Sequence, residues 1–573
     1  MVGSRSLIKA VFLIVAIALG IILGWSVLWT PAPLGRHFEI SAYRMYDHLQ
    51  VIAAEERSVF HQERRLYVRD YLIRKIERHG LTAEIDYFTV DWVDYAGRDV
   101  ILEGSNVFVR IYGRSDTAIM LMAHYDSRGV DWTLNPASNV YSPGAADAGY
   151  GLSVMLEIAR IFVGRELENS IYLLFTDLEE IWLLGAEHAA STMDLSNVSM
   201  ILNLEGRGVR GPVYMFETSP NDLNVVRFFQ EATRHRMSYS LTTAILRMMP
   251  NDTDLTPFLE RDFIGMNFAP LNSIFYYHTA DDSLENISLS TMQQYIEMIA
   301  EIVELYVTDP RFSDVNYFRT NRSGVYFSLP RGFLVLYSEI TAMILGFVML
   351  VLVLLLIAYL WLQNEISFNK IFKWWGYIVA YIIVFAFLGL GTSQFIARFT
   401  GQRFSISYVL IRPERYVMWV AVAITIIGFS LMHYVLKNRF TRNEMVSSSL
   451  LMLAVINAVL SIVMPAATFL VFIPLVLTFI SVILSFIARN NIIVISITAS
   501  LPIVLIGILF IPVLFSFLLA LTIGGLAILL VLSIIMVVSF PALWRDIALP
   551  LGTNVLRVSE GGVISAYIDT QAR

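Results

Sequence analysis

The sequence predicts two kinds of fold in one chain: an α/β domain with a mixed, mostly parallel central sheet flanked by helices, and an all-α bundle of transmembrane helices. The first observation is composition, because 56% of the 573 residues are hydrophobic and 16% are charged. That balance lies outside the usual range of soluble globular domains. The second is distribution: long uncharged apolar runs occur at both ends of the chain, and short apolar runs alternate with helical patterns between them.

The N-terminal apolar run, residues 10–29, predicts an uncleaved membrane anchor. It carries no charge and is preceded by Arg5 and Lys9. About 20 apolar residues span a bilayer as a helix, whereas the apolar core of a cleaved signal peptide has about 7–15. This run is longer than such a core and ends in Trp25 and Trp29. We therefore expect an anchor over residues 1–30.

Residues 31–332 have the composition of a soluble domain and are enough for a sizeable core. Short apolar runs predict buried strands, and longer periodic runs that end near a glycine predict helices. Their alternation along the chain indicates a largely parallel sheet. The strands are expected at 119–123, 171–175 and 200–204, and the helices at 66–78 and 152–163.

Residues 333–545 predict a bundle of about seven transmembrane helices, followed by a C-terminal tail over 546–573. Between Val446 and Trp544 the only charged residue is Arg489. A charge at mid-bilayer costs about 2.5–3.5 kcal/mol on insertion scales, so such a clean stretch indicates a membrane-embedded segment. Pro465 separates two spans. The expected spans are 337–362, 374–396, 416–436, 447–464, 466–488, 491–510 and 512–542.

The lack of cysteine limits the chemistry that the chain can perform. Disulfides, cysteine-type zinc sites and a thiol nucleophile are excluded, so a bound metal must rely on histidine, aspartate and glutamate. The net charge is −7 and no long basic run is present, which speaks against nucleic acid as a partner.

Polar residues gather where the predicted strands end. Histidine or acidic residues follow each of the three strands, another histidine follows the apolar run 274–277, and an aspartate lies in a glycine-rich turn before a predicted helix. Open α/β sheets bind ligands beyond the carboxyl ends of their strands, and zinc accepts such nitrogen and oxygen ligands. The residues are His124, Asp126, Asp147, Glu179, Glu180, Glu205 and His278.

Each of these residues alone has a purely structural explanation. A histidine after a strand is more often a structural residue, and the pair Glu179–Glu180 is more often a solvated helix start. Asp147 could cap the following helix, and Asp252 and Asp254 could be turn or cap residues. The combination and its order along the chain make a shared metal site the better interpretation.

In these motifs the sequence resembles the co-catalytic zinc exopeptidases of metallopeptidase clan MH, on the aminopeptidase-like branch, over about residues 40–310. An anchor before the domain and a bundle after it resemble the group of vacuolar membrane proteases, endoplasmic-reticulum metallopeptidases and their bacterial relatives. The matching motifs are His-Tyr-Asp (124–126), Pro-Gly-Ala-Ala-Asp-Ala-Gly-Tyr-Gly (143–151), Glu-Glu (179–180) before Leu-Gly-Ala-Glu (184–187), Asn-Leu-Glu-Gly-Arg-Gly (203–208) and Tyr-His-Thr (277–279).

The resemblance implies a role for each motif residue and two zinc ions per chain. One zinc would be held by His124 and Glu205, and the other by Glu180 and His278. Asp147 would bridge the two ions. Asp126 would orient His124, since a ligating imidazole needs its other N–H fixed. Glu179 would be the general base, and Tyr277 would hydrogen-bond the developing oxyanion.

Three features depart from the family pattern or extend it. Glu205 stands where many members have aspartate, and Ala148 stands where a second aspartate or asparagine is common. The stretch 128–141 reads as an insertion between the first two motifs and is expected to shape the rim of the pocket.

The resulting prediction is a membrane-anchored zinc metallopeptidase, an aminopeptidase by resemblance, acting on peptides or proteins. Two alternatives stay open: a glutaminyl-cyclase-like acyl transfer, and a membrane receptor or transporter with an inactive peptidase-like domain. The complete set of five ligands speaks against the cyclase, and the scarcity of ionisable residues in the last spans speaks against a transporter. The positive-inside rule places the 31–332 domain outside the cytoplasm. Substrate preference and oligomeric state do not follow from the sequence.

Overall fold

The computed structural model describes residues 2–129, 134–247, 252–399, 439–487 and 491–513, with short pieces of 423–436 and residues 557–558 and 564–565. The chain forms two compact units. One consists mainly of Trp25–Ile340 and is built of strands and helices, and the other consists mainly of Met1–Gly24 and Thr341–Leu514 and is helical.

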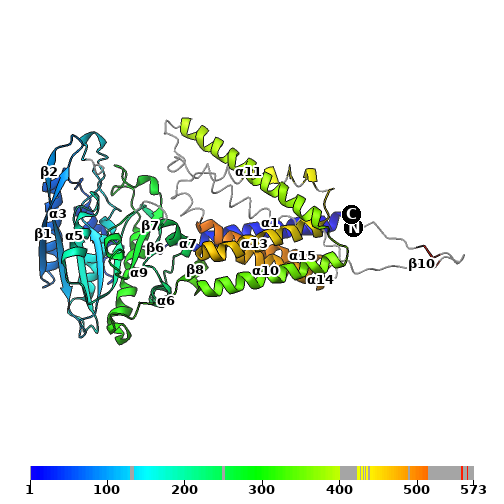
Figure 1. Ribbon diagram of the computed structural model, residues 1–573. Helices are drawn as coiled ribbons and strands as arrows, with labels where there is room; N and C mark the ends of the chain where they lie inside the picture. The colour runs from blue at the N-terminus through cyan, green and yellow to red at the C-terminus, as the bar shows by residue number, and fades with distance from the viewer. Residues whose placement is uncertain are drawn as a thin grey trace. The chain divides into compact units, whose positions relative to one another are not determined.

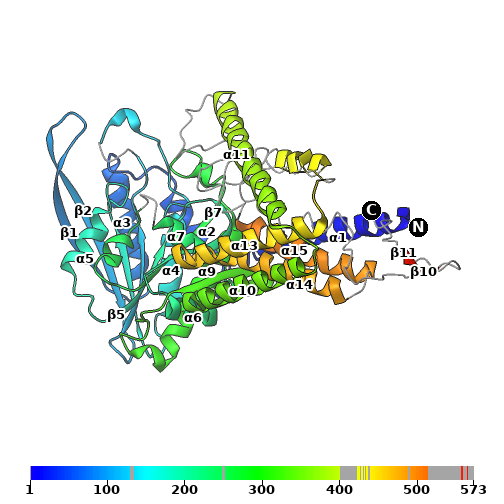
Figure 2. The same ribbon diagram turned by 45° about the vertical axis from the view of Figure 1, so that its right-hand side comes forward.

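A sheet forms the centre of the α/β unit (Figures 1 and 2). It has seven strands in the order β1-β2-β4-β3-β5-β7-β6. The four middle strands β4, β3, β5 and β7 are mutually parallel, whereas β1, β2 and β6 pair antiparallel at the two edges. The strands are β1 (Ala83–Val93), β2 (Asp99–Ile111), β3 (Ala118–His124), β4 (Ser170–Thr176), β5 (Val198–Leu204), β6 (Arg210–Thr218) and β7 (Gly265–Asn272).

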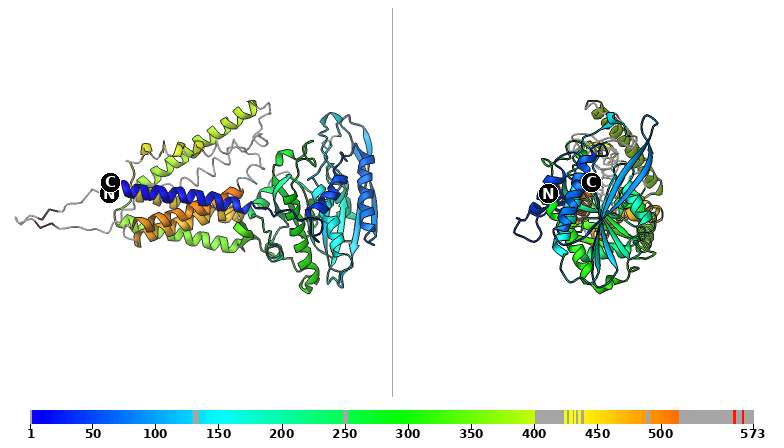
Figure 3. Two further views of the ribbon diagram at one scale, coloured as in Figure 1. Left: turned by 180° about the vertical axis from the view of Figure 1, so that it is seen from behind. Right: turned by 90° about the vertical axis from the view of Figure 1, so that its left-hand side faces the viewer.

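Both faces of the middle strands are covered, which explains why these strands are apolar at every position. Along β3, Ile119 and Leu121 belong to one buried cluster, while Met120 and Met122 belong to a second cluster on the opposite face. The right-hand view of Figure 3 looks onto this unit from its end. The first face packs against α2 (Ala42–Ile52), α3 (Gln62–Glu77), α4 (Gly149–Phe162), α6 (Leu223–Ala232) and α9 (Leu289–Thr308); the second packs against α5 (Leu184–Thr192) and α8 (Thr256–Leu259).

The predicted α/β fold is therefore confirmed, and each predicted strand and helix lies within about four residues of its observed counterpart. The edge strands and the later helices were not predicted. A separate hairpin, β8 (Gly324–Leu329) with β9 (Phe333–Ser338), follows α9, so the predicted boundary at residue 332 falls in the turn of this hairpin. The short helix α7 (Ser240–Leu246) packs on β8.

The helical unit contains five described helices that are long and apolar enough to cross a membrane: Glu339–Leu362, Phe368–Leu388, Arg442–Val463, Phe469–Ile487 and Ser496–Val513. They belong to α10 (Glu339–Leu362), α11 (Phe368–Phe399), α13 (Arg442–Val463), α14 (Phe469–Ile487) and α15 (Ile492–Val513), and α1 (Val2–Val27) runs beside several of them (Figure 3). About half of the predicted span 416–436, nearly all of 512–542 and most of the tail lie outside the described residues.

Proline and glycine positions explain or mark three details of this unit. The break between α13 and α14 occurs at Pro465, as predicted, where a short 3₁₀ turn replaces the helix. Pro474 lies inside α14, and neighbouring helices can satisfy the freed backbone groups. Gly24 of α1 allows close packing on α15, because a Cβ atom there would lie 2.5 Å from the carbonyl oxygen of Gly507.

Candidate metal centre

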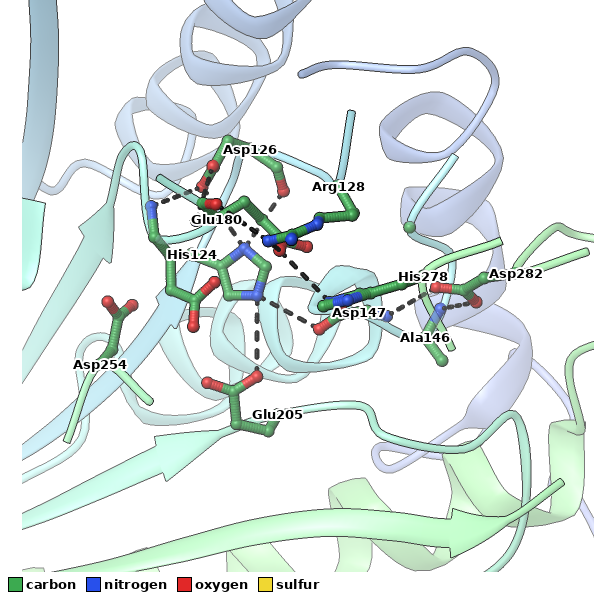
Figure 4. A network of polar contacts seen from close by, with 12 residues as sticks. His124, Asp126, Arg128, Ala146, Asp147, Glu180, Glu205, Asp254, His278 and Asp282 are labelled. Carbon is green, nitrogen blue, oxygen red and sulfur yellow. Dashed lines mark hydrogen bonds and ion pairs between the residues drawn. The ribbon is translucent and has the colours of Figure 1, made fainter. Parts of the chain in front are cut away.

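The predicted site residues come together at the carboxyl edge of the four parallel strands (Figure 4). His124 is the last residue of β3, Glu179 and Glu180 lie in the turn after β4, and Glu205 directly follows β5. Because β4 and β5 flank β3 on opposite sides, this edge is a point where the chain connections diverge, the usual place for a ligand in such sheets. Asp147 reaches the same point from the turn that precedes α4.

His278 reaches the site from a turn and not from a strand. The apolar run 274–277 was expected to lead into the site as the other apolar runs do, but Ile274–Tyr276 is a 3₁₀ turn that follows β7. Ser273 and His278 on either side of it have positive φ angles of 63° and 55°. Such angles reverse the chain sharply, and this turn brings the imidazole back to the sheet edge.

Asp147 lies between the two histidines and presents a different carboxylate oxygen to each. Its Oδ1 is 3.3 Å from His124 Nε2, and its Oδ2 is 3.2 Å from His278 Nε2. Each histidine faces a second carboxylate: Glu205 Oε2 is 3.6 Å from His124 Nε2, and Glu180 Oε2 is 3.2 Å from His278 Nε2. The result is two imidazole–carboxylate clusters that share one aspartate.

The arrangement of these side chains is explained better by a pair of bound metal ions than by hydrogen bonds among the side chains themselves. Ligand atoms of His124, Glu179 and Glu205 lie within 4.8 Å of one another, as do those of Asp147, Glu180 and His278. In the described part of the chain, His278 Nε2 and Glu180 Oε1 are buried without a hydrogen-bond partner of acceptable geometry. Unsatisfied buried polar atoms are costly, and lone pairs directed at a common cation would satisfy them. Glu179, the expected base, also lies within ligand reach of one cluster.

Asp126 connects the first histidine to the turn that carries the two glutamates. Its Oδ1 is 3.4 Å from His124 Nδ1 and accepts a hydrogen bond from the backbone N–H of Glu179 at 3.1 Å. Its Oδ2 accepts from the N–H of Glu180 at 3.2 Å. One fully buried carboxylate therefore fixes both the imidazole plane and the position of the Glu179–Glu180 backbone.

The site concentrates negative charge in a buried place. Burial raises the pKa of Glu179 well above its usual value, and the neighbouring Glu180 and Glu205 raise it further, beyond what the opposing His124 offsets. Burial lowers the pKa of His278, but Glu180 and Asp147 outweigh that effect and raise this pKa to about 9. The excess of carboxylate charge over the two imidazoles adds to the effect of burial at Glu179 and outweighs it at His278. Divalent cations would supply the missing positive charge.

Two arginines flank the carboxylates. Arg128, in the predicted insertion, places its Nη1 3.2 Å from Glu180 Oε2. Residues 130–133 of that insertion lie outside the described part of the chain. Arg207 is 9% exposed and lies over the rings of Phe216 and Tyr277, 5.6 Å and 5.9 Å from their centroids. Tyr277, the expected oxyanion donor, is thus held against a buried cation beside the clusters.

Three further residues support the site and were not predicted for it. Asp282 accepts hydrogen bonds from the backbone N–H groups of Ala146 and Asp147, at 2.8 Å and 3.2 Å. Buried Arg57 donates to the carbonyl oxygens of Tyr125, Pro143, Gly144 and Asp147.

Asp254 was read from the sequence as a turn or cap residue, yet it is fully buried beside the site and accepts a hydrogen bond from the Thr176 hydroxyl. Its neighbour in the same motif, Asp252, is exposed, as the turn interpretation expects. Only the three-dimensional contacts separate the two aspartates.

Comparison with known proteins agrees with this geometry. Residues 106–303 match the model of Peptidase family M28. These residues form an M28 peptidase domain. The matched segment lies within residues 40–310, for which the motifs predicted such a family, and it contains every proposed ligand.

Relatives of the M28 domain are themselves named as membrane-compartment proteases. The chain is 28% identical to a putative endoplasmic reticulum metallopeptidase 1 of Schizosaccharomyces pombe, over 42% of this chain and 28% of the relative. It is 27% identical to a vacuolar membrane protease of Candida dubliniensis, over 37% of this chain and 22% of the relative. The chain thus spans less than a third of the length of these two relatives.

Solved structures with a similar fold include two kinds of enzyme. An aminopeptidase from Aneurinibacillus sp. strain AM-1 is 14% identical with a TM-score of 0.38, covering 47% of this chain and 95% of that chain. A glutaminyl cyclase of Porphyromonas gingivalis is 18% identical with a TM-score of 0.38, covering 47% and 99%. Likeness at this level does not distinguish a peptidase from a cyclase.

Proposed function

We propose that the protein is a membrane-anchored zinc metallopeptidase that hydrolyses peptide bonds. The observation that supports this most directly is the position of Asp147, whose two carboxylate oxygens face different histidines. A carboxylate shared in this way suits a pair of zinc ions, which take imidazole and carboxylate ligands. Membership of the domain in Peptidase family M28 supports the reaction class.

In this proposal His124 and Glu205 would hold one zinc, Glu180 and His278 would hold the other, and Asp147 would offer one carboxylate oxygen to each side. Asp126 acts as a positioning residue, because it fixes His124 and the backbone of the two glutamates. Such supporting hydrogen bonds typically change metal affinity or activity 10–100-fold.

Paired zinc ions, when bound, activate water and polarise a carbonyl oxygen. The chain supplies the remaining chemistry. Glu179 accepts a proton at its carboxylate and returns it to the leaving amine. The Tyr277 hydroxyl donates a hydrogen bond to the carbonyl oxygen as negative charge develops there, and Arg207 behind its ring supports that charge.

The finer proposal is an exopeptidase that removes residues from the free amino terminus of a peptide. It rests on the aminopeptidase-like order of the motifs. No residue is assigned here as an acceptor for the amine of the substrate. We further propose that residues 1–30 anchor the chain, that 31–332 form the catalytic domain on the extracytoplasmic side, that 333–545 form the membrane bundle, and that 546–573 form a tail.

Activity of the purified full-length protein on a matched peptide panel tests the proposal. The panel contains one sequence with a free amino terminus, the same sequence N-acetylated, and a peptide that begins with glutamine. We expect release of the first residue from the free peptide, loss of activity with a chelator, recovery with zinc, and up to two zinc ions per chain by elemental analysis.

Other outcomes would each replace a part of this proposal. Cleavage of the acetylated peptide would indicate an endopeptidase or a carboxypeptidase. Conversion of the glutamine peptide to pyroglutamate without hydrolysis would indicate a cyclase. Activity in protein that contains no transition metal would overturn the zinc assignment.

A further inference from the structure

A cavity whose lining shares no residue with the candidate metal centre opens on the α/β unit. Its volume is about 760 Å³. It is formed by the end of α1 and the segment after it (26–34), the turn 234–237, one side of α9 and the β8–β9 turn. Ligand pockets typically measure about 300–1,000 Å³, so the cavity is large enough for a small amphiphilic molecule.

The lining of this cavity has an apolar part and a basic part. The apolar part comes mainly from the segment after α1, and the basic part comes from two turns. The apolar side chains are Val27, Trp29, Pro31, Leu34, Met237 and Leu329; the basic ones are Arg234, His235, Arg236 and Arg331. This combination suits a ligand with an anionic group joined to a hydrocarbon part.

One of the three arginines is already neutralised. Arg234 places its Nη2 2.8 Å from Glu297 Oε2 and its Nε 3.1 Å from Glu301 Oε1. His235 Nε2 lies 2.7 Å from the same Glu297 oxygen. Glu297 is the one carboxylate that lines the cavity in the described part of the chain. Its Oε2 is used by these contacts, and its Oε1 accepts a hydrogen bond from Gln293 Nε2 at 2.9 Å.

The other two arginines have no carboxylate within ion-pair distance among the described residues. Arg236 donates from Nη1 to the carbonyl oxygen of Gly332 at 3.4 Å, and its Nε is buried without a hydrogen-bond partner. Arg331 is exposed at the rim. A partly buried guanidinium that lacks a counter-ion is unfavourable, so an anion in the cavity would stabilise the arrangement.

Chain connectivity indicates where this cavity lies with respect to a bilayer. Val27, part of its lining, is the last residue of α1, and Gly332, also part of its lining, directly precedes β9 and the apolar helix α10. Trp29 is 64% exposed, and tryptophan is enriched where a membrane meets water. If α1 and α10 span the membrane, as proposed above, the two lining segments next to these helices lie close to the bilayer surface.

We propose that this cavity binds the head group of an anionic phospholipid. Arg236 and Arg331 contact the phosphate, and the hydrocarbon part lies along Val27, Trp29 and Leu34. The proposal depends on the membrane spans and does not depend on the peptidase activity. Free phosphate shares the anionic chemistry but cannot use the apolar lining, so it should bind far more weakly.

Native mass spectrometry of the full-length protein in detergent micelles can test this, with phosphatidylglycerol and phosphatidylcholine added at equal concentration. We expect the wild-type protein to retain one phosphatidylglycerol in preference to phosphatidylcholine. Arg236→Gln and Arg331→Gln should each lower this preference about fivefold, the size typical of one basic residue near an anionic lipid. Arg331 is exposed, so its substitution tests the site even if the Arg236 variant folds poorly.

Arg78→Gln is the matched control, because Arg78 is exposed and lies outside the cavity lining. It removes the same charge and should leave the lipid preference unchanged. An equal loss of lipid preference in this variant would show that the effect comes from the net charge of the protein, and would contradict the proposed site. Equal retention of both lipids by the wild-type protein, or displacement of phosphatidylglycerol by inorganic phosphate at the same concentration as the lipid, would also overturn the proposal.

Discussion

At the residue scale, the most informative contrast is between Glu179 and Glu180, which are adjacent in the chain but differ in their surroundings. Glu180 Oε2 is 3.2 Å from His278 and from Arg128, so its carboxylate belongs to one imidazole cluster. Glu179 is grouped with His124 and Glu205 by distance, yet it forms no ion pair with His124 in the described part of the chain. The same aspartate, Asp126, fixes the backbone of both residues. Different roles for neighbouring side chains are therefore compatible with one rigid turn.

We predict that Glu179→Gln keeps its metal and its fold but loses turnover by about 10²–10⁴-fold, the usual contribution of a general base. Glu180→Gln should lose metal as well as activity, because an amide is a poorer ligand for zinc than a carboxylate. Zinc content, thermal unfolding and peptide hydrolysis are measured on both variants. Near-normal activity of the Glu179 variant would contradict the mechanism. Metal loss in that variant alone would mean that the two roles are reversed.

A site residue could be predicted from the sequence when the features that identify it lie close to it along the chain, and not when its partners lie far away. Each of the proposed ligands follows an apolar run or precedes a helix, so the local pattern was enough to identify it. Asp282, Arg57 and Asp254 act through hydrogen bonds to residues 135, 87 and 78 positions away, and no local pattern reports such contacts. Asp252 and Asp254 lie in one motif, and only folding buries the second.

At the element scale, the spacing of the proposed ligands depends on how closely α4 approaches β3 and β5. A Cβ atom on Gly151 of α4 would lie 2.2 Å from the carbonyl oxygen of Leu204 and 3.0 Å from Ala123 Cβ. These two residues directly precede Glu205 and His124. Asp147 lies just before the same helix, so this single glycine contact sets the distance between three proposed ligands.

The parallel strands could be predicted because both of their faces are buried, which makes their apolar runs continuous. The hairpin of β1 and β2 could not, since many of its side chains are exposed and its pattern is mixed. The turn after β7 was also missed. Its apolar residues are only partly buried, so they resemble a strand in sequence while the positive φ angles around them reverse the chain.

We predict that Gly151→Ala lowers the free energy of unfolding by about 1–3 kcal/mol, the usual range for an extra methyl group in a packed core. The atoms it meets include backbone, which cannot move aside. Zinc affinity should fall as well, because α4 must shift away from the strands. Gly376→Ala, in α11, is the control, since a Cβ atom there meets nothing within 4 Å. Unchanged zinc affinity in the Gly151 variant would show that helix packing does not set the ligand spacing.

At the scale of the whole molecule, the α/β unit is connected at both ends to apolar helices, α1 before it and α10 after it. If both helices cross the bilayer, the α/β unit lies on one side and the loop between α10 and α11 lies on the other. Basic residues occur in the N-terminal part of α1, at Arg5 and Lys9, and at the start of α11, just after that loop, at Lys370 and Lys373. From the positive-inside rule we predict that both groups lie in the cytoplasm and that the α/β unit lies outside it.

Because the chain contains no cysteine, single introduced cysteines can test this topology without background labelling. Tyr87→Cys places a thiol on the α/β unit, where Tyr87 is 67% exposed, and Gln363→Cys places one in the exposed loop between α10 and α11. We predict that a membrane-impermeant maleimide labels the Tyr87 variant in sealed, right-side-out membrane vesicles, and labels the Gln363 variant only after the membrane is opened. The unmodified chain controls for reaction at other residues. The reverse pattern would place the α/β unit in the cytoplasm, and labelling of both variants in sealed vesicles would mean that α10 does not cross the membrane.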